Sequence, residues 1–159
     1  RDRDVTGVQT CALPISDLAG IVCVNPVTQP LGDDMMGAIR GMIDGGTETF
    51  PGIGSDIADP NVKESSYSET PLRALSSLMV DGVTPLSTSY GSINVLMMLF
   101  SSRNDHVVDP VQGDFLAANY GGACERIMLE KSFHVATQDL EKDVINTKAV
   151  EFARKVTAS

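Results

Sequence analysis

The sequence is short of aromatic residues and of positive charge. It has no tryptophan, aromatic residues make up 5 % of its 159 residues, and 12 Lys and Arg stand against 21 Asp and Glu, which gives a net charge of −9. Nucleic-acid binding needs basic side chains near the phosphates and, for single strands, aromatic rings on which bases stack. Anionic lipid surfaces also attract basic segments rather than acidic ones. The composition therefore argues against nucleic acids and acidic membranes as partners.

Cysteine pairs, clusters of histidine and long apolar runs are missing as well. The three cysteines, Cys11, Cys23 and Cys124, show no Cys-x-x-Cys spacing, and the chain has two histidines. A zinc site would have few ligands to draw on, so we expect no bound metal and reduced cysteines, as in the cytoplasm. The longest apolar run, residues 95–100, is too short to insert stably across a bilayer.

The first sixteen residues, RDRDVTGVQTCALPIS, do not fit the remainder of the chain. They begin without methionine, show neither helical nor strand periodicity, and lack the apolar stretch of a signal peptide. They resemble the translated read-through of sequencing-adapter DNA that occurs at the ends of metagenome-derived proteins. We therefore treat residues 1–16 as a non-native segment and expect the native domain to span residues 17–159.

From residue 17 onward the pattern predicts an α/β fold. Short apolar runs at 20–25 and 95–100 are typical of buried strands of a parallel sheet, and residues 125–129 are expected to form a third strand. Amphipathic helices are expected at 31–44, from residue 71, after residue 110 and at 141–156. The strand–helix–strand unit that ends at residue 129 predicts a right-handed crossover between parallel strands. Residues 27–92 form a connection so long that we expect a lid or cap with helices.

Titratable residues of special type follow two of the predicted strands. The loop after residues 95–100 reads SSRNDHVVDP, and the loop after residues 125–129 reads EKSFHV. Ligands gather at the carboxyl ends of parallel strands, so Asp105 and His134 on these loops are expected to meet. A carboxylate and an imidazole in contact are the orienting group and the base of Ser-His-Asp chemistry. Asp109 is the competing acid, but its place before Pro110 is typical of a helix N-cap.

These motifs resemble those of a known family. SRNDHVVDP and SFHVATQDLEKD are similar to the acid and histidine motifs of α/β-hydrolases, and most of all to those of the bacterial carboxylesterase and monoacylglycerol lipase group, the serine-aminopeptidase-like branch. GIVCVNPVTQP resembles the strand that follows the nucleophile helix in that group. The resemblance implies a partial α/β-hydrolase fold, with Asp105 as the triad acid, His134 as the general base, a structural role for His106, and no cofactor.

The same resemblance gives the connection at residues 27–92 the place of the family's lid. Met35, Met42, Leu75 and Met79 are then expected to line an acyl pocket, because thioethers adapt to flexible chains. Core packing beneath a surface loop is the alternative for these four residues. Six acidic residues in the first half of the connection lack the spacing of a calcium loop, so we expect a solvated face; they are Asp33, Asp34, Asp44, Glu48, Asp56 and Asp59.

The sequence departs from the family in one respect, since it contains no Gly-x-Ser-x-Gly nucleophile elbow. In the family the elbow precedes the strand that residues 20–25 resemble. We therefore expect the C-terminal part of a serine hydrolase that acts on small-molecule acyl esters in the intact parent and is inactive alone. The alternatives are a thioesterase, peptidase or dehalogenase of the same fold, and a non-catalytic α/β binding module in which Asp105 and His134 are incidental.

Overall fold

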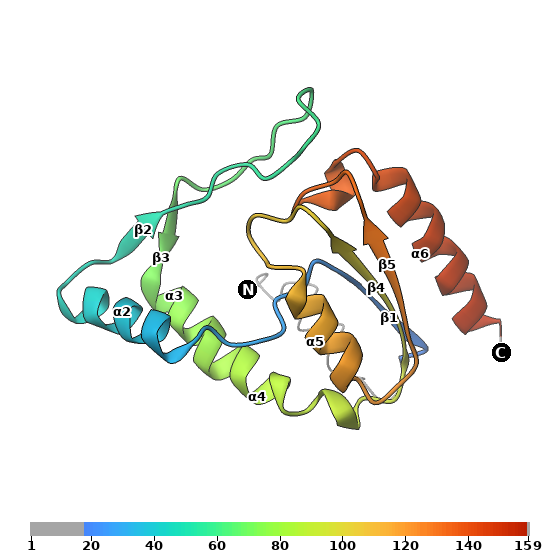
Figure 1. Ribbon diagram of the computed structural model, residues 1–159, viewed down its shortest axis with the longest axis horizontal. Helices are drawn as coiled ribbons and strands as arrows, with labels where there is room; N and C mark the ends of the chain where they lie inside the picture. The colour runs from blue at the N-terminus through green and yellow to red at the C-terminus, as the bar shows by residue number, and fades with distance from the viewer. Residues whose placement is uncertain (1–17, 159) are drawn as a thin grey trace, which may run out of the picture.

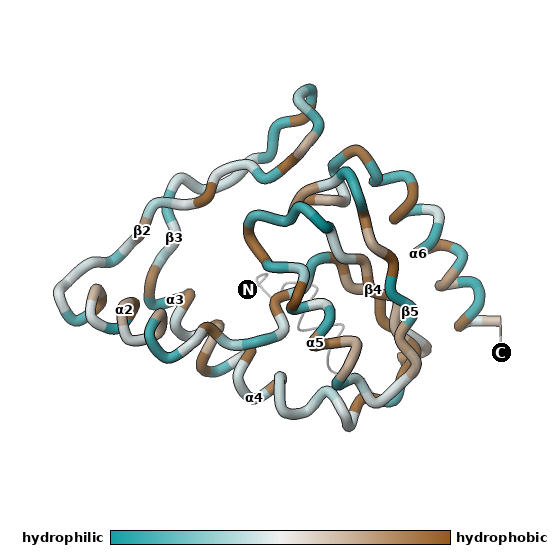
Figure 2. Tube along the Cα trace, in the orientation of Figure 1, coloured by the Kyte–Doolittle hydropathy of each residue, from teal (hydrophilic) through white to brown (hydrophobic). Residues whose placement is uncertain are grey.

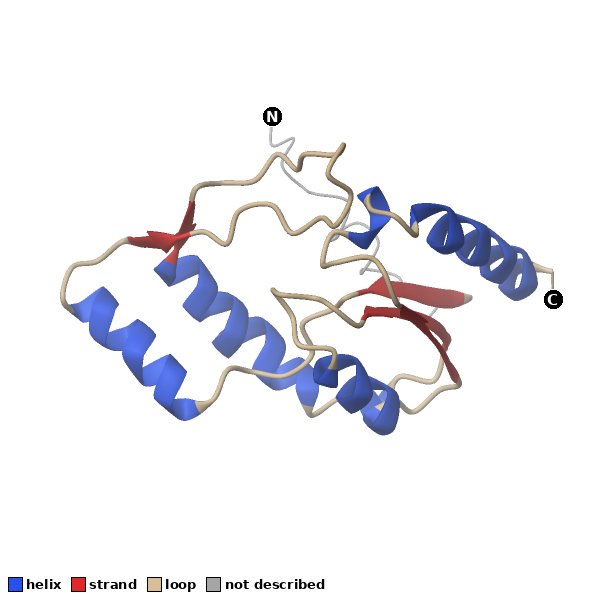
Figure 3. Cartoon of the chain, turned by 45° about the horizontal axis from the view of Figure 1, so that its top comes forward, coloured by secondary structure: helices blue, strands red, loops and turns tan. Residues whose placement is uncertain are grey.

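The computed structural model of the chain describes residues 18–158, so the segment 1–16 with Cys11 lies outside the described residues. Figures 1 and 3 show a small sheet with helices on both faces and a separate arm of helices and loops. The strands are β1 (Gly20–Val24), β2 (Thr49–Pro51), β3 (Glu69–Pro71), β4 (Leu96–Ser102) and β5 (Cys124–Leu129). The α-helices are α2 (Asp33–Asp44), α3 (Leu72–Ser77), α4 (Thr84–Ser87), α5 (Val111–Asn119) and α6 (Lys142–Thr157). Shorter turns are a π-helical one at Leu78–Val83 and 3-10 ones at Tyr90–Ser92 and Ala136–Gln138.

The main sheet is parallel and has the order β1-β4-β5, with β4 in the middle. The three strands are those that the apolar runs predict, and β4 and β5 are joined through α5, as the strand–helix–strand pattern requires. Parallel pairing brings the carboxyl ends of all three strands to one edge of the sheet (Figure 1). The loops that carry Asp105 and His134 leave from this edge.

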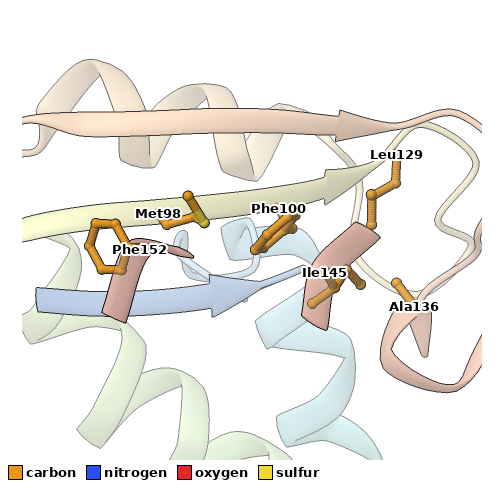
Figure 4. Packing of buried hydrophobic residues seen from close by; sticks show 6 residues of the cluster. All are labelled: Met98, Phe100, Leu129, Ala136, Ile145 and Phe152. Atoms are coloured by element: carbon orange, nitrogen blue, oxygen red, sulfur yellow. The ribbon is translucent and has the colours of Figure 1, made fainter. Parts of the chain in front are cut away.

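Alternation along β4 explains how its two faces are covered. Successive side chains of a strand point to opposite faces of the sheet. Met98 and Phe100 pack on one face against Ile145 and Phe152 of α6 (Figure 4). Met97 and Leu99 point to the other face, where they belong to the same cluster as residues of α5. A central strand covered by helices on both faces reads as a continuous apolar run, as it does here.

The prediction of a fully buried strand at residues 20–25 is wrong for β1. Its residues are only partly buried, and the side chain of Val22 is exposed. The reason is its position, because within the described part of the chain β1 pairs with β4 alone and its second edge has no strand beside it. A β-branched run predicts a strand, whereas its burial depends on what lies next to it in space.

The connection from β1 to β4 forms a hydrophobic cluster of its own beside the sheet. The cluster joins α2, α3 and the π-helical turn, and its buried members are Met36, Ile39, Leu72, Met79 and Val83. Between α2 and α3 the chain runs through the short antiparallel pair β2–β3 and a long loop, residues 52–68, which returns toward the sheet (Figures 1 and 3). This loop is largely hydrophilic, whereas β4 is largely hydrophobic (Figure 2).

Candidate active site

Asp105 and His134 meet at the carboxyl edge of the sheet. Asp105 lies three residues beyond the end of β4 and His134 five beyond the end of β5, and His134 Nδ1 is 2.9 Å from Asp105 Oδ2. The carboxylate is almost completely buried, with 1 % of the side chain exposed, while the imidazole remains 30 % exposed. The prediction that the two loops bring these side chains together is confirmed. A buried acid beside a partly open base is the arrangement that triad chemistry requires.

The turn after β4 orients the carboxylate of Asp105. Its Oδ1 accepts the N–H groups of Val107 and Val108, each at 2.8 Å, so Oδ2 faces His134. An ionised carboxylate only accepts hydrogen bonds, which assigns the proton of a neutral His134 to Nδ1. Nε2 is then the unprotonated nitrogen and can act as a base.

The hydrogen bond also sets the charge preference of His134. It raises the pKa of the imidazole above its ordinary value, against the opposite effect of burial. The negative charges of Asp105, Asp56 and Glu64 act in the same direction as the hydrogen bond. All three carboxylates favour the imidazolium that forms when the base takes up a proton.

Asp109, the competing acid, caps a helix. Its Oδ1 accepts the N–H of Val111, the first residue of α5, at 2.9 Å. The residue at the N-cap position is Pro110, one later than predicted, but the exposed Asp109 carboxylate still accepts an N–H at the start of the helix, as a capping side chain does. The geometry therefore favours Asp105 over Asp109 as the partner of the histidine.

Asn25 supports the histidine loop from the end of β1, a role that we did not predict. Its Nδ2 donates to the carbonyl oxygen of His134 at 2.8 Å and to Ser102 Oγ at 2.9 Å, while its Oδ1 accepts the N–H of Ser102. Its φ of 47° lies in the left-handed region, which asparagine tolerates better than most residues. The asparagine before Pro26 was a signal of a strand end, but only the fold shows what its side chain contacts.

Two carboxylates after His134 hold the backbone of the same loop. Asp139 accepts the N–H of Phe133 at 2.8 Å and of Leu140 at 2.7 Å, and Glu141 accepts those of Lys131 and Ser132 at 2.8 and 2.9 Å. Burial alone would raise the pKa of each carboxyl group, but these N–H donors keep both values below the ordinary ones. Both residues belong to the motif that resembles the family, yet the motif did not reveal their contacts.

The prediction of a solvated acidic face is wrong for Asp56. Its side chain is 8 % exposed, and its Oδ1 lies 2.7 Å from His106 Nδ1. His106, which the resemblance gives a structural role, also packs edge-to-face on Phe133 with 4.5 Å between ring centroids. The loop that carries Asp56 folds back onto the sheet edge, which its acidic and glycine-rich composition does not reveal. Of the other five acids in this set, Asp59 is half-buried and the remaining four lie exposed; they are Asp33, Asp34, Asp44 and Glu48.

A cavity of about 320 Å³ opens beside His134, between its loop and the segment around β2 and β3. Its apolar lining includes Ile53, Tyr67 and Val107, and Glu64 contributes a carboxylate. None of these residues was a predicted pocket residue, although Ile53 and Tyr67 are large apolar or aromatic side chains in an otherwise polar loop. A site of this size next to a base can hold a small organic ligand.

The residues expected to line an acyl pocket lie elsewhere. Met79 is buried in the cluster of the connection, with Met42 and Leu75 packed against it, so the alternative of core packing describes these three. Met35 is 57 % exposed on α2. None of the four lines the cavity beside His134, and a substrate-binding role for them stays a prediction.

Over residues 18–158, no group of three or more His, Cys, Asp or Glu side chains is arranged to hold a metal ion. In the same range, no helix combines the length and the apolar character that crossing a membrane demands.

No protein-family model matches the chain, but individual proteins do. A thermostable monoacylglycerol lipase from Bacillus sp. (strain H-257) is 32 % identical over 145 residues, which are 87 % of this chain and 54 % of the lipase. A structure from the metagenome-derived lipolytic enzymes LipS and LipT has a TM-score of 0.78 and 33 % identity, over 87 % of this chain and 56 % of that one. This chain therefore spans about half the length of these two relatives.

A monoacylglycerol lipase from Paleococcus ferrophilus shares the fold at a much lower identity. Its TM-score is 0.65 with 11 % identity, over 88 % of this chain and 60 % of that one. The fold class that the sequence predicts, a partial α/β-hydrolase with a parallel sheet and flanking helices, is confirmed.

Proposed function

We propose that this chain, which has a partial α/β-hydrolase fold, supplies the acid and the base of a serine esterase or lipase. The observation that carries this proposal is the 2.9 Å contact between His134 Nδ1 and the buried Asp105 carboxylate. That contact leaves Nε2 free on a partly exposed ring beside a cavity. The lipolytic names of the two relatives above support an acyl ester as the substrate.

The reaction would follow the serine-hydrolase sequence. A serine attacks the ester carbonyl, His134 Nε2 takes the serine proton and later gives it to the leaving alcohol, and Asp105 stabilises the imidazolium in between. The 159 residues hold no Gly-x-Ser-x-Gly, so we propose that the serine and the oxyanion donors come from a segment outside this sequence. Residues 17–159 would then be the C-terminal part of a cytoplasmic enzyme, with residues 27–92 as its lid.

The complete enzyme tests this proposal once the coding sequence upstream of residue 17 is recovered. It should hydrolyse a short p-nitrophenyl ester and bind a fluorophosphonate at one serine, and His134→Ala should abolish both. Hydrolysis of an acyl thioester but not of the ester would point to a thioesterase instead. A complete protein that binds no fluorophosphonate would contradict the proposed serine chemistry.

The chain as given should show no ester hydrolysis that depends on the triad. Triad members act as a unit with the oxyanion donors, so a base and an acid without an activated serine have nothing to activate. The assay compares the chain with its His134→Ala variant on the same p-nitrophenyl ester. Turnover well above background that disappears in the variant would reveal a nucleophile within these 159 residues.

A further inference from the structure

One carboxylate of the loop 52–68 lies between the two loops that carry the acid and the base. Asp56 Oδ2 accepts the N–H of His134 at 2.9 Å and the N–H of His106, the residue after Asp105, at 3.1 Å. Asp56 is 50 residues from His106 in the sequence and 78 from His134. A single buried carboxylate thus joins three segments that are remote along the chain.

The backbone around Asp56 is fastened to the same place. The carbonyl oxygen of Asp56 accepts the N–H of Val135 at 3.1 Å. Two residues on, the N–H groups of Ala58 and Asp59 donate to the carboxylate of Asp139 at 2.8 and 2.9 Å. Asp139 also holds the N–H of Phe133. The segment at residues 56–59 is therefore docked on the histidine loop through backbone groups on both sides, which leaves little freedom for either.

Building on the function proposed above, we propose that Asp56 is a positioning residue for the catalytic pair. It fixes the backbone of His134 and of the residue that follows Asp105, so that the imidazole is held in the direction of its partner only while the loop 52–68 is seated. Misplacement of a reacting group by about 1 Å costs on the order of 100-fold in rate, so such a clamp has a measurable effect. Asp56 acts through the two loops and takes no part in proton transfer.

Two substitutions of Asp56 separate the effect of its hydrogen bonds from the effect of its negative charge. Asp56→Ala removes the acceptor for both N–H groups. Asp56→Asn keeps one carbonyl oxygen, which can accept both of them, and places an amide that can donate to His106 Nδ1. The asparagine variant therefore preserves the clamp but removes a negative charge that faces His134 together with Asp105 and Glu64. Because that charge raises the pKa of His134, its loss lowers the pKa.

The experiment measures kcat and KM of the complete enzyme on a p-nitrophenyl ester. Asp56→Ala should lower kcat on the order of 100-fold with KM changed less than about threefold. Asp56→Asn should recover kcat to within about tenfold of the wild type, and the acid limb of its kcat/KM profile should move to lower pH. Asp59→Ala is the matched control, because the Asp59 carboxylate contacts Asn61 alone in the described structure and its loss should leave kcat within about twofold.

A second readout does not depend on turnover. The proton on His134 Nδ1, assigned by its loss in His134→Ala, should give a sharp low-field NMR signal in the wild type, Asp56→Asn and Asp59→Ala. The signal should broaden or vanish in Asp56→Ala. Unchanged kcat and an unchanged signal in Asp56→Ala would overturn the positioning role. A complete protein without hydrolase activity whose signal still depends on Asp56 would refute the proposed function and keep the positioning role.

Failure of Asp56→Ala to fold still leaves a decisive comparison. Asp56→Asn is then measured against Asp59→Asn. A lower-pH acid limb and a kcat reduced by no more than about tenfold in Asp56→Asn alone would support the proposal. Identical profiles for the two variants would refute it.

Discussion

The carboxyl edge of the sheet carries two pairs of aspartate and histidine that look alike and are built differently. His134 Nδ1 lies 2.9 Å from Asp105, and His106 Nδ1 lies 2.7 Å from Asp56. Each carboxylate also accepts two backbone N–H groups. For Asp105 the two donors are two and three residues away, whereas for Asp56 they lie on two distant loops.

This difference fits the proposed roles, in which Asp105 and His134, the chemical pair, serve the reaction and Asp56 and His106, the assembly pair, hold loops together. Asp105 is oriented by two N–H groups of its own turn, which leaves its second oxygen to face His134. Asp56 holds distant segments together, and its histidine is 58 % exposed, against 30 % for His134. The His134 ring lines the cavity, whereas the His106 ring packs on Phe133. Equal distances between a carboxylate and an imidazole therefore do not imply equal roles.

The largest expected effect comes from breaking the chemical pair. In the complete enzyme, Asp105→Asn should lower kcat roughly 10⁴-fold, because the wrong tautomer of His134 is favoured, and His134→Ala should be at least as damaging. Steady-state kinetics on a p-nitrophenyl ester measure both effects. Asp109→Asn is the matched control and should be mild, since Asp109 caps α5. A severe effect of Asp109→Asn with a mild one of Asp105→Asn would reverse the choice of acid.

A large loss of stability is expected at Asp139, because its carboxylate holds both the histidine loop and the segment that carries Asp56. Asp139→Ala leaves four backbone N–H groups without their acceptor, two in the histidine loop and two in the segment of Asp56. Hydrogen bonds to charged groups contribute about 1.5–3 kcal/mol each and are not additive, so the free energy of unfolding should fall by about 3 kcal/mol. Urea unfolding of the complete protein measures the change.

The pH dependence checks the cause of that loss. The pKa of Asp139 is lowered in the folded state, so its contribution to stability is present above the unfolded pKa of about 4 and is lost as the pH falls through the folded value. The difference in unfolding free energy between the wild type and Asp139→Ala should therefore shrink below about pH 4. A difference that stays constant down to pH 3 would show that packing, rather than the charged acceptor, explains the loss.

A smaller effect is expected in the pH profile of activity, where the pKa of His134 tests its pairing with Asp105. His134 must be neutral to act as a base, and its pKa is raised above the ordinary value of about 6.5. The acid limb of kcat/KM should accordingly lie above pH 6.5 in the complete enzyme. The free energy of unfolding changes with pH in the opposite direction. The His134–Asp105 interaction contributes fully below the pKa of His134 in the unfolded chain, and this contribution is lost as the pH rises through the higher pKa of the folded protein. An acid limb below pH 6 would show that the Asp105 carboxylate does not stabilise the imidazolium.

The smallest effect is expected from removing His106, the exposed member of the assembly pair. His106→Ala removes one hydrogen bond to Asp56 and one ring contact with Phe133, and it leaves the N–H of residue 106 in place. The stability should fall by about 1 kcal/mol and kcat by less than about threefold. Thermal unfolding and kinetics measure the two effects. A loss of kcat near that of His134→Ala would mean that the roles of the two histidines are wrongly assigned here.

Patterns that act over a few residues were sufficient to predict much of this fold. The apolar runs predict β1, β4 and β5, and the periodicity of residues 141–156 predicts α6 nearly to its bounds at Lys142–Thr157. Chain order and parallel pairing then bring Asp105 and His134 to one edge, because loops that follow neighbouring parallel strands must meet there. The capping role of Asp109 follows from its neighbour Pro110 in the same way.

Contacts between distant segments were beyond the reach of those patterns. Asp56 reads as one more acid in a polar loop, and nothing within ten residues of it indicates burial between two histidine loops. The methionines of the connection read equally well as a pocket or as a core, and the packing of Met42 and Met79 around α2 and α3 depends on which helices meet. The exposure of β1 likewise depends on which strands lie beside it.

The sequence by itself determined the α/β alternation and the pair of loops that present an acid and a base. These features depend on residue periodicity, on turn chemistry and on the direction of parallel strands, all of which are local or follow from chain order. Only the tertiary structure decided that Asp56, Asn25 and Asp139 fasten those loops and that the cavity lies beside His134. The physical reason is that a buried polar side chain must find its partners wherever the folded chain brings them, at any separation in the sequence.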